Sequence, residues 1–279
     1  MTASPMRNTR PARCRAFVAA SALVAALWFV PQSARAQDML QFIDLTTDEF
    51  TKAEMTRGDV VALIKARSTG KGIHLSSKRL NNLDLSGLDL SGANLQSARI
   101  NGTSFKNAKL EGAVLDQAWA LKADFTGASL GGSSLFSTQF MGATLDGADF
   151  SGARVAGDFS RASLKGARFD RADLSADMRN QSMGLMRGVF RSADLEGASF
   201  REANLARVVL EYARLRDADL AGANLAGSEM GGADLTGASI AGADCSNAVV
   251  NSARLLDLKG KSEARYFDKT VISDRACTD

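Results

Sequence analysis

Residues 91–110 read Ser-Gly-Ala-Asn-Leu, Gln-Ser-Ala-Arg-Ile, Asn-Gly-Thr-Ser-Phe, Lys-Asn-Ala-Lys-Leu, and this stretch decides the fold. A large apolar residue, called the centre below, returns at every fifth position. A small residue stands two positions before nearly every centre, as Ala93 does before Leu95. The same frame extends in both directions, from about Leu75 to Leu255. A repeat of fixed period is the sequence signature of a solenoid, in which each turn packs mainly against its neighbours.

A period of five residues excludes both a long helix and a flat strand. Five residues of an α-helix sweep roughly 500°, so the centres would drift around the helix instead of lining one face. Side chains of a strand alternate with a period of two, so successive centres would point to opposite faces. We therefore expect three extended residues whose two ends point inward, followed by a two-residue bend. Glycines at the second bend position, such as Gly92 and Gly102, agree with this because glycine tolerates unusual dihedrals.

The repeat resembles the motif of the pentapeptide-repeat family, which is a small residue, Asn or Asp, Leu and two variable residues. The resemblance covers roughly residues 71–255. It implies an all-β solenoid, a right-handed quadrilateral parallel β-helix of about nine coils with four pentapeptides in each coil of twenty residues. The best-known family members resist or inhibit DNA gyrase by imitating duplex DNA.

Eleven centres represent the predicted interior. They are Leu95, Phe105, Leu110, Leu115, Phe125, Phe140, Phe150, Phe169, Phe190, Leu215 and Leu235.

The frame slips twice. Four residues separate Val155 from Phe159, and eleven separate Leu174 from Leu185, one more than two repeats. The second slip predicts a bulge from Ala176 to Ser182, with Met178 pointing inward. Its role stays open between a functional feature and a tolerated insertion at a corner. We expect no insertion longer than about one residue within the repeats, and therefore no concave pocket.

Residues 1–36 have the pattern of a secretory signal. Four arginines precede an apolar run over residues 16–30, and Ser33-Ala34-Arg35-Ala36 then predicts cleavage after Ala36. A retained membrane anchor needs about twenty apolar residues, whereas this run has fifteen. The sequence therefore predicts a periplasmic or secreted protein with no transmembrane segment after cleavage.

Cleavage changes the charge of the chain. The signal holds five of the 34 basic residues and none of the 31 acidic ones, which leaves 29 basic residues against 31 acidic ones. The mature net charge is therefore −2, and the basic balance of the full chain gives no reason to expect a nucleic-acid partner.

The segments on either side of the repeat are expected to cover the open ends of the coil. Residues 37–70 are predicted to form an N-terminal helical cap, with capping-box spacing in Thr46-Thr47-Asp48-Glu49. Residues 256–279 are predicted to form a C-terminal capping tail, with Phe267 and Val271 four residues apart. The repeat domain between them spans residues 71–255.

The sequence offers no catalytic, metal or cofactor site. The only histidine, His74, has no cysteine or second histidine near it in the sequence. Outward aspartates such as Asp84 and Asp89 could pair as acid and base, but the enzymes that use such pairs build clefts from long loops. Cys245 occupies a centre, and whether it forms a disulfide with Cys277 stays open.

Two features of the surface are predicted. Trp119 and Phe136 are expected to be exposed aromatic residues that form a partner-contact patch. A charge ladder is expected along one face, because Asp194, Arg214, Asp234 and Arg254 alternate in sign at intervals of twenty residues. Arg154 and Asp173 are expected to precede them in the same column, which would place Asp173 next to Asp194.

These observations favour a non-enzymatic exported protein that acts as a rigid structural or protein-binding rod in the periplasm. The partner is an unknown protein, and a homodimer stays open. One alternative is a DNA-mimic modulator of a topoisomerase, which would need an acidic surface free of residues such as Arg168 and Arg201. A second alternative is a β-helical carbohydrate-active enzyme.

Overall fold

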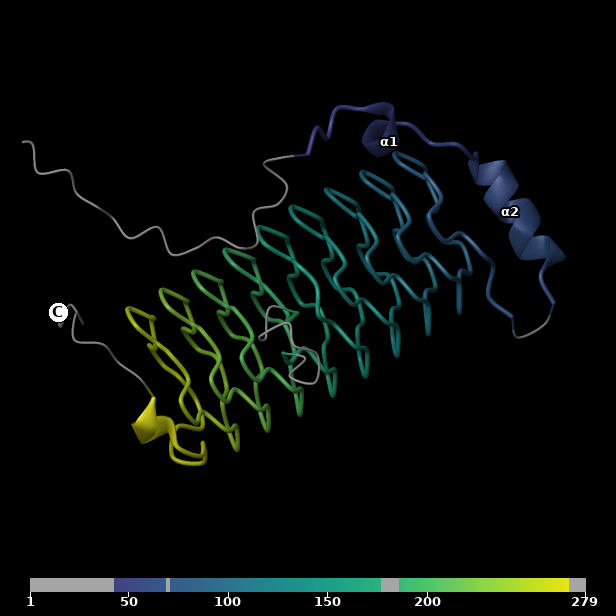
Figure 1. Cartoon of the computed structure of the whole chain (residues 1–279). Helices are drawn as coiled ribbons and strands as arrows, with labels where there is room; N and C mark the ends of the chain where they lie inside the picture. The colour runs from purple at the N-terminus through teal and green to yellow at the C-terminus, as the bar shows by residue number, and fades with distance from the viewer. Residues whose placement is uncertain (1–42, 69–70, 177–185, 271–279) are drawn as a thin grey trace, which may run out of the picture. The chain divides into compact units, whose positions relative to one another are not determined.

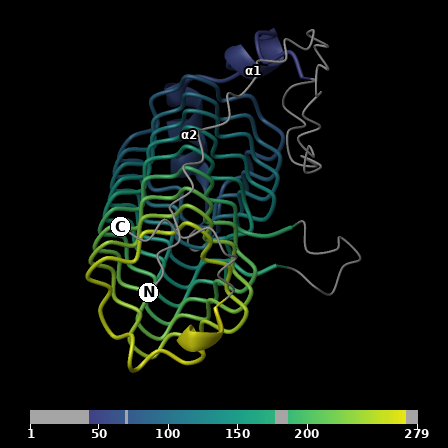
Figure 2. The ribbon, with the colours of Figure 1, turned by 90° about the vertical axis from the view of Figure 1, so that its left-hand side faces the viewer.

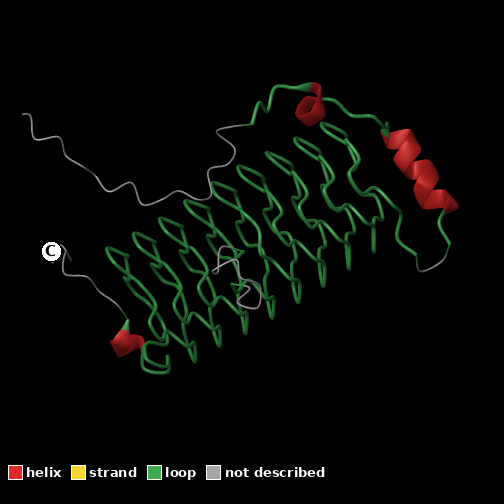
Figure 3. Ribbon diagram, viewed as in Figure 1, coloured by secondary structure: helices red, strands yellow, loops and turns green. Residues whose placement is uncertain are grey.

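The structure, a computed structural model, describes residues 43–68, 71–176 and 186–270. These residues form helix α1 (Asp48–Thr51), helix α2 (Arg57–Ala66), a long coil and the 3-10 helix η2 (Phe267–Lys269). The described coil is paired through isolated bridges of single residues, so Figure 3 draws it as loop. The expectation of an all-β solenoid is therefore met only in part: the chain coils as expected, but its extended pieces are too short to count as strands.

The bridges fall into four columns, which give the coil four sides (Figures 1 and 2). We number these faces 1 to 4 by the residues that open them, which are His74, Arg79, Asp84 and Asp89. Successive members of a column are usually twenty residues apart, as in the parallel bridge between His74 and Asn94. The predicted coil length of four pentapeptides is thus the observed one.

Backbone hydrogen bonds hold each pentapeptide to the coils before and after it. The N–H of Leu95 donates to Val114 O in the next coil at 2.7 Å, and the N–H of Val114 donates back to Ala93 O at 2.9 Å. Within one coil, the N–H of Ala98 donates to Leu95 O at 3.0 Å and closes the bend. The extended residues therefore place their backbone donors in a continuous ladder.

The bends explain the motif's preference for Asp or Asn before the centre. Asp124 Oδ1 accepts a hydrogen bond from the N–H of Thr126 at 3.0 Å, and equivalent bonds recur at other corners. A short carboxylate or amide can satisfy the donor of a residue two positions later in this way. The second bend residue has a positive φ, 66° at Gly92, which favours glycine there.

The interior contains the small residues and the centres. All eleven predicted centres are buried, with exposed fractions of 2% or less. Phenylalanines at equivalent positions stack directly: the ring centroids of Phe150 and Phe169 are 4.7 Å apart, and those of Phe169 and Phe200 are 4.9 Å apart. Rings of adjacent columns meet edge to face, such as Phe159 and Phe169 at 6.5 Å. The core is therefore a set of continuous apolar stacks along the coil axis.

The first frame slip is a shortened corner. Gln139 pairs with Asp158, nineteen residues later, so the coil loses one bend residue here. Gly157 occupies the tightened corner, where an added Cβ would lie 2.7 Å from Thr138 O. Glycine is therefore required by the close approach of the two backbones.

The second slip differs from its prediction. Asp173 pairs with Asn204 on face 1, and Val189 pairs with Asp158 on face 2. Sixteen residues thus separate Asp173 from Val189, where five separate ordinary neighbours, so the insertion has eleven residues and the prediction of about one extra residue is wrong. The error arose because Leu185 stands five residues before Phe190 and imitates the repeat. Residues 177–185, with Met178, lie outside the described residues.

The helix α2 lies over the N-terminal end of the coil (Figures 1 and 2). Its Val60 is fully buried in the same apolar cluster as Ile73 and Leu75. The capping box occurs at α2, where Thr56 N donates to Asp59 Oδ2 at 2.8 Å and Asp59 N donates to Thr56 Oγ1 at 3.2 Å. The capping box predicted at residues 46–49 is wrong, because Thr47 precedes α1 without a side-chain cap.

At the other end the coil continues past residue 255, since Asp244 pairs with Arg265. Phe267 of η2 is partly buried against the core. Val271 and Cys277, like the predicted signal over residues 1–36, lie outside the described residues.

Candidate interaction surface

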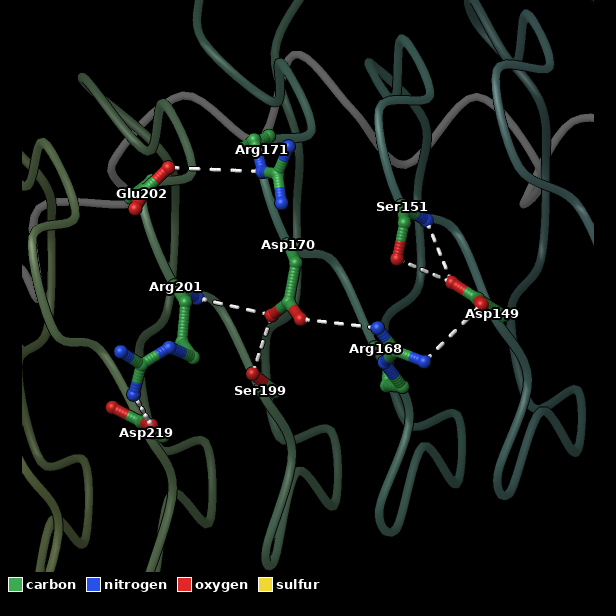
Figure 4. A network of polar contacts seen from close by, with 9 residues as sticks. All are labelled: Asp149, Ser151, Arg168, Asp170, Arg171, Ser199, Arg201, Glu202 and Asp219. Carbon is green, nitrogen blue, oxygen red and sulfur yellow. Dashed lines mark hydrogen bonds and ion pairs between the residues drawn. The ribbon is translucent and has the colours of Figure 1, made fainter.

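Face 4 carries a network of alternating charges that links several coils (Figure 4). Arg168 Nη1 lies 3.6 Å from Asp149 Oδ2, and its Nη2 lies 3.4 Å from Asp170 Oδ2. The other oxygen of Asp170 accepts hydrogen bonds from the Ser199 hydroxyl and from Arg201 N, the latter at 3.2 Å. Because Asp170 precedes the insertion and Ser199 follows it, these bonds hold the two halves of the coil in register.

The network continues towards the C-terminus. Arg201 Nη1 lies 2.6 Å from Asp219 Oδ2, and Arg171 Nε lies 3.7 Å from Glu202 Oε2 (Figure 4). Both of these ion pairs join opposite charges of neighbouring coils, which is a favourable arrangement for stacked side chains. The sequence alone does not reveal this network, because the insertion hides the step from Arg168 to Ser199.

Face 3 contains the predicted charge ladder. The structure places Asp194, Arg214, Asp234 and Arg254 in one column as successive bridge partners. Arg214 Nη1 lies 3.3 Å from Asp194 Oδ2, and Arg254 Nη1 lies 3.6 Å from Asp234 Oδ2. Asp234 has a closer partner in the corner residue Arg216, whose Nε lies 2.7 Å away. The ladder is thus two ion pairs with a corner arginine between them.

The expected start of this ladder is wrong. Asp194 pairs with Ser163 on face 3, whereas Arg154 and Asp173 pair with each other on face 1. The eleven-residue insertion shifts every later residue by two faces relative to the predicted register. No like-charged contact between Asp173 and Asp194 arises.

The hydrogen bonds around Asp234 perturb its titration. Partial burial raises the pKa of the carboxyl group, but hydrogen bonds from Thr236 and Arg216 outweigh this effect and lower the pKa to about 2. Thr236 Oγ1 and N donate at 2.6 and 3.1 Å. Bonds to the charged form favour that form.

The expectation that Trp119 and Phe136 are both exposed is corrected by the structure. The ring of Trp119 on face 2 meets Phe50 of α1 edge to face, with centroids 5.1 Å apart, and is half-buried. Phe136 is also half-buried, and the Arg154 guanidinium lies 5.7 Å from its ring centroid. The sequence could not show that residues 47–54, called the strap below, fold back over Trp119. A role of either residue in partner contact stays a prediction.

The remaining candidates for chemistry give little. His74 is exposed at the start of face 1. Cys245 is a buried free thiol, and burial raises its pKa to about 11, which opposes formation of the reactive thiolate. Across the residues that the structure describes, no group of three or more His, Cys, Asp or Glu side chains is arranged to hold a metal ion.

The four columns and the five-residue repeat define a quadrilateral β-helix. The family of pentapeptide repeats matches the chain in eight copies, over residues 79–118, 122–157, 189–222 and 218–255. The chain belongs to the pentapeptide-repeat family, whose fold is a right-handed quadrilateral β-helix. Members of this family are generally not enzymes.

Several solved structures are similar to the chain. QnrB1, a plasmid-mediated fluoroquinolone resistance protein, is 18% identical, with 66% of this chain and 90% of that chain covered and a TM-score of 0.50. HetL, a pentapeptide repeat protein involved in heterocyst differentiation regulation in the cyanobacterium Nostoc sp. strain PCC 7120, is 26% identical; the match covers 76% of this chain and 94% of HetL, with a TM-score of 0.38. A pentapeptide repeat protein of the Arabidopsis thaliana thylakoid lumen is 27% identical over 42% of this chain and 68% of that chain, with a TM-score of 0.20. The likeness to QnrB1 shows the shared fold alone. Among curated proteins, none matches significantly.

Proposed function

We propose that the protein is a non-enzymatic exported rod that binds another protein through its outer faces in the periplasm. The observation that carries this proposal is the fixed order of those faces. A backbone bridge recurs at nearly every pentapeptide, so outward side chains keep one register over the length of the coil. A surface that is rigid before binding loses little entropy when a partner docks.

Export rests on the predicted signal over residues 1–36. Within the described residues, no helix combines the length and the apolarity needed to span a bilayer. Several ion pairs of the described surface join neighbouring coils, such as Arg168 with Asp149 and Arg201 with Asp219, and these pairs support a rod whose faces keep a fixed pattern.

The charge pattern disfavours the DNA-mimic alternative. Imitation of duplex DNA needs a continuous row of negative charge. On faces 3 and 4 several acidic groups lie beside a cation of a neighbouring coil: Asp149 beside Arg168, Asp219 beside Arg201 and Asp194 beside Arg214. An assay of DNA gyrase is therefore not the first experiment to perform on this protein.

The test is photo-crosslinking in the periplasm with the full chain and its own signal. A photoreactive amino acid is placed at Asn224, Glu229, Asp234 or Ser239, which present the four faces within one coil. The buried Leu225 of the same coil serves as the matched control. We expect a discrete crosslinked protein from one face or from two adjacent faces, and mature protein that begins at Gln37. Absence of a crosslink from every face, or equal smears from all of them, would contradict a specific binding rod.

A further inference from the structure

The strap occupies a defined site on face 2. The ring of Phe50 lies against Trp119 on one side, and the Arg99 guanidinium lies 5.1 Å from its centroid. Phe50 is only 8% exposed, although it belongs to a helix of four residues on the outside of the coil. An aromatic side chain between an indole ring and an arginine is a common anchor of protein–peptide contacts.

Asparagine side chains of the coil recognise the backbone of the strap. Asn81 Nδ2 donates to the carbonyl oxygens of residues 49 and 52 at 3.0 and 3.1 Å. Asn82 Nδ2 donates to the carbonyl of residue 51 at 2.9 Å, and Asn101 Nδ2 donates to that of residue 50 at 3.3 Å. Asn81 and Asn101 are 2% and 9% exposed. Their Oδ1 atoms accept hydrogen bonds from Asn101 N and Leu121 N of the coil, both at 3.0 Å, so the coil orients each amide and leaves its nitrogen to bond the strap. Contacts to main-chain carbonyls do not depend on the sequence of the segment that supplies them.

The strap then pairs with the edge of the first coil. Ala53 forms an antiparallel bridge with Leu80, and the N–H of Glu54 donates to Arg79 O at 2.9 Å. This arrangement is strand addition at an open edge, a general mode of peptide recognition. It extends the backbone contacts beyond the aromatic anchor.

Charged residues of the coil set the side-chain preference of the site. Glu49 forms an ion pair with Arg99, and Glu54 forms ion pairs with Lys78 at 3.1 Å and Arg79 at 3.3 Å. The Nε atom of Arg99 is buried and has no hydrogen-bond partner. The site therefore selects an acidic residue directly before an aromatic residue, as in Glu49 and Phe50. It also selects a second acidic residue four positions after the aromatic one, as in Glu54.

The strap is suited to be displaced. A helix of four residues has no stability of its own, so its order depends on the contacts with face 2. The Glu49 side chain is still 52% exposed. Tethering gives the strap an effective concentration on the order of millimolar, which a partner segment must outcompete.

We propose that Asn81, Arg99, Asn101 and Trp119 form a peptide-docking site, which the chain fills with its own strap and which binds a partner segment with the same acidic–aromatic–acidic pattern. This proposal rests on the proposed function of a protein-binding rod and names one site on it. Release of the strap and capture of the partner segment are then two states of one equilibrium.

The experiment uses a fluorescein-labelled peptide of residues 44–56 as the probe and the full chain as the receptor. The double variant Glu49→Ala, Phe50→Ala removes the side chains that fill the site in cis. Fluorescence anisotropy should show saturable binding to this variant that is at least tenfold tighter than to the wild-type chain. A peptide with Phe50→Ala should bind at least tenfold more weakly than the probe. Equal affinity of the probe for both chains, or equal affinity of both peptides, would overturn the proposal.

A third substitution tests the location of the site. Trp119→Ala in the double variant should weaken probe binding at least tenfold, and Arg99→Ala provides a second test if the first chain melts early. Leu256→Ala, at an exposed corner 61% open to solvent, is the matched control and should leave binding unchanged. Dimers of the double variant with wild-type chains would instead make a second copy the occupant and would also overturn the proposal. Failure of the peptide to bind leaves the crosslinked partner of the rod untouched, so the two proposals fail separately.

Discussion

The inner and outer sides of one wall of the coil are built from adjacent residues, yet their side chains differ in burial and in the kind of contact that they make. Phe150 and Phe169 follow Asp149 and Arg168 in the sequence. The two rings stack 4.7 Å apart with no exposure to solvent, whereas the Arg168 and Asp149 side chains form an ion pair 3.6 Å long and are 56% and 38% exposed. The same stacking of coils thus stabilises the fold through the buried rings and sets the order of charges on the exposed surface. A repeat can therefore keep its core constant while its surface changes.

The largest expected effect lies on the inner side. Phe169→Ala should lower the free energy of unfolding by about 3–5 kcal/mol, because the cavity lies between two stacked rings and cannot collapse easily. Arg168→Ala, one residue earlier, should cost no more than about 1 kcal/mol. Urea unfolding of both variants measures the difference. Similar losses for the two variants would break the distinction between the inner and outer sides.

The second largest effect is the acid sensitivity that Asp234, an outer residue with several hydrogen bonds, gives to the fold. The pKa of Asp234 is lowered to about 2, so the group stabilises the fold fully above its unfolded pKa of about 3.9. This stability is lost as the pH falls from about 4 through the folded pKa of about 2. The lowered pKa corresponds to an upper limit of about 2.5 kcal/mol, and Asp234→Asn should remove this part of the acid sensitivity. Unfolding measured between pH 5 and pH 2 checks it; parallel pH profiles of the two proteins would contradict the prediction.

The corner residues lie between the inner and outer sides of the wall, and some of them contact the next coil. Tyr212 at a corner has a φ of 57°, and its ring lies over Gly232 of the next coil, where an added Cβ would come within 2.6 Å. Gly132 also has a positive φ of 63° but has no atom within 4 Å of an added Cβ. Both Gly→Ala changes incur left-handed strain, and only Gly232→Ala must also displace the Tyr212 ring.

We therefore expect Gly232→Ala to be less stable than Gly132→Ala by about 1 kcal/mol. Adding Tyr212→Ala to Gly232→Ala should recover most of that difference, which a double-mutant cycle measures. If the two glycine variants melt together, outer corners do not couple neighbouring coils.

The regular part of this structure could be predicted from the sequence, and the irregular part could not. The period of five excludes helix and strand, and the resemblance to the pentapeptide-repeat family adds the coil of four pentapeptides that the stacked bridges show. The insertion was misjudged because Leu185 keeps the spacing of a centre, and spacing cannot distinguish two further faces from a loop. The strap was missed because its partner Trp119 is distant in sequence. One signal was present: Asn81 and Asn101 occupy the same corner twenty residues apart, where buried amides need a partner.

The smallest expected effect tests whether the alternating charges on face 3 contribute to the free energy of unfolding. Arg214 faces Asp194 at 3.3 Å and Glu196 at 3.4 Å, and it is the bridge neighbour of Asp234. Arg214→Ala removes exposed ion pairs and should cost about 0.2–1 kcal/mol. Arg214→Glu places a fourth negative charge beside these three carboxylates and should cost a few tenths of a kcal/mol more, since like charges in register repel.

Salt separates this electrostatic part from the loss of packing that both variants share. At 1 M salt the Debye length falls to about 3 Å, so repulsion between exposed carboxylates is largely screened. The gap between the melting temperatures of Arg214→Glu and Arg214→Ala should therefore narrow, while each variant stays below the wild type by the part due to the arginine's aliphatic stem. Equal melting temperatures at low salt would mean that stacking within the column does not make these charges interact. The alternating charges on face 3 would then contribute only to the binding of a partner. The inner side alone would stabilise the fold, and the outer side would add nothing to the free energy of unfolding.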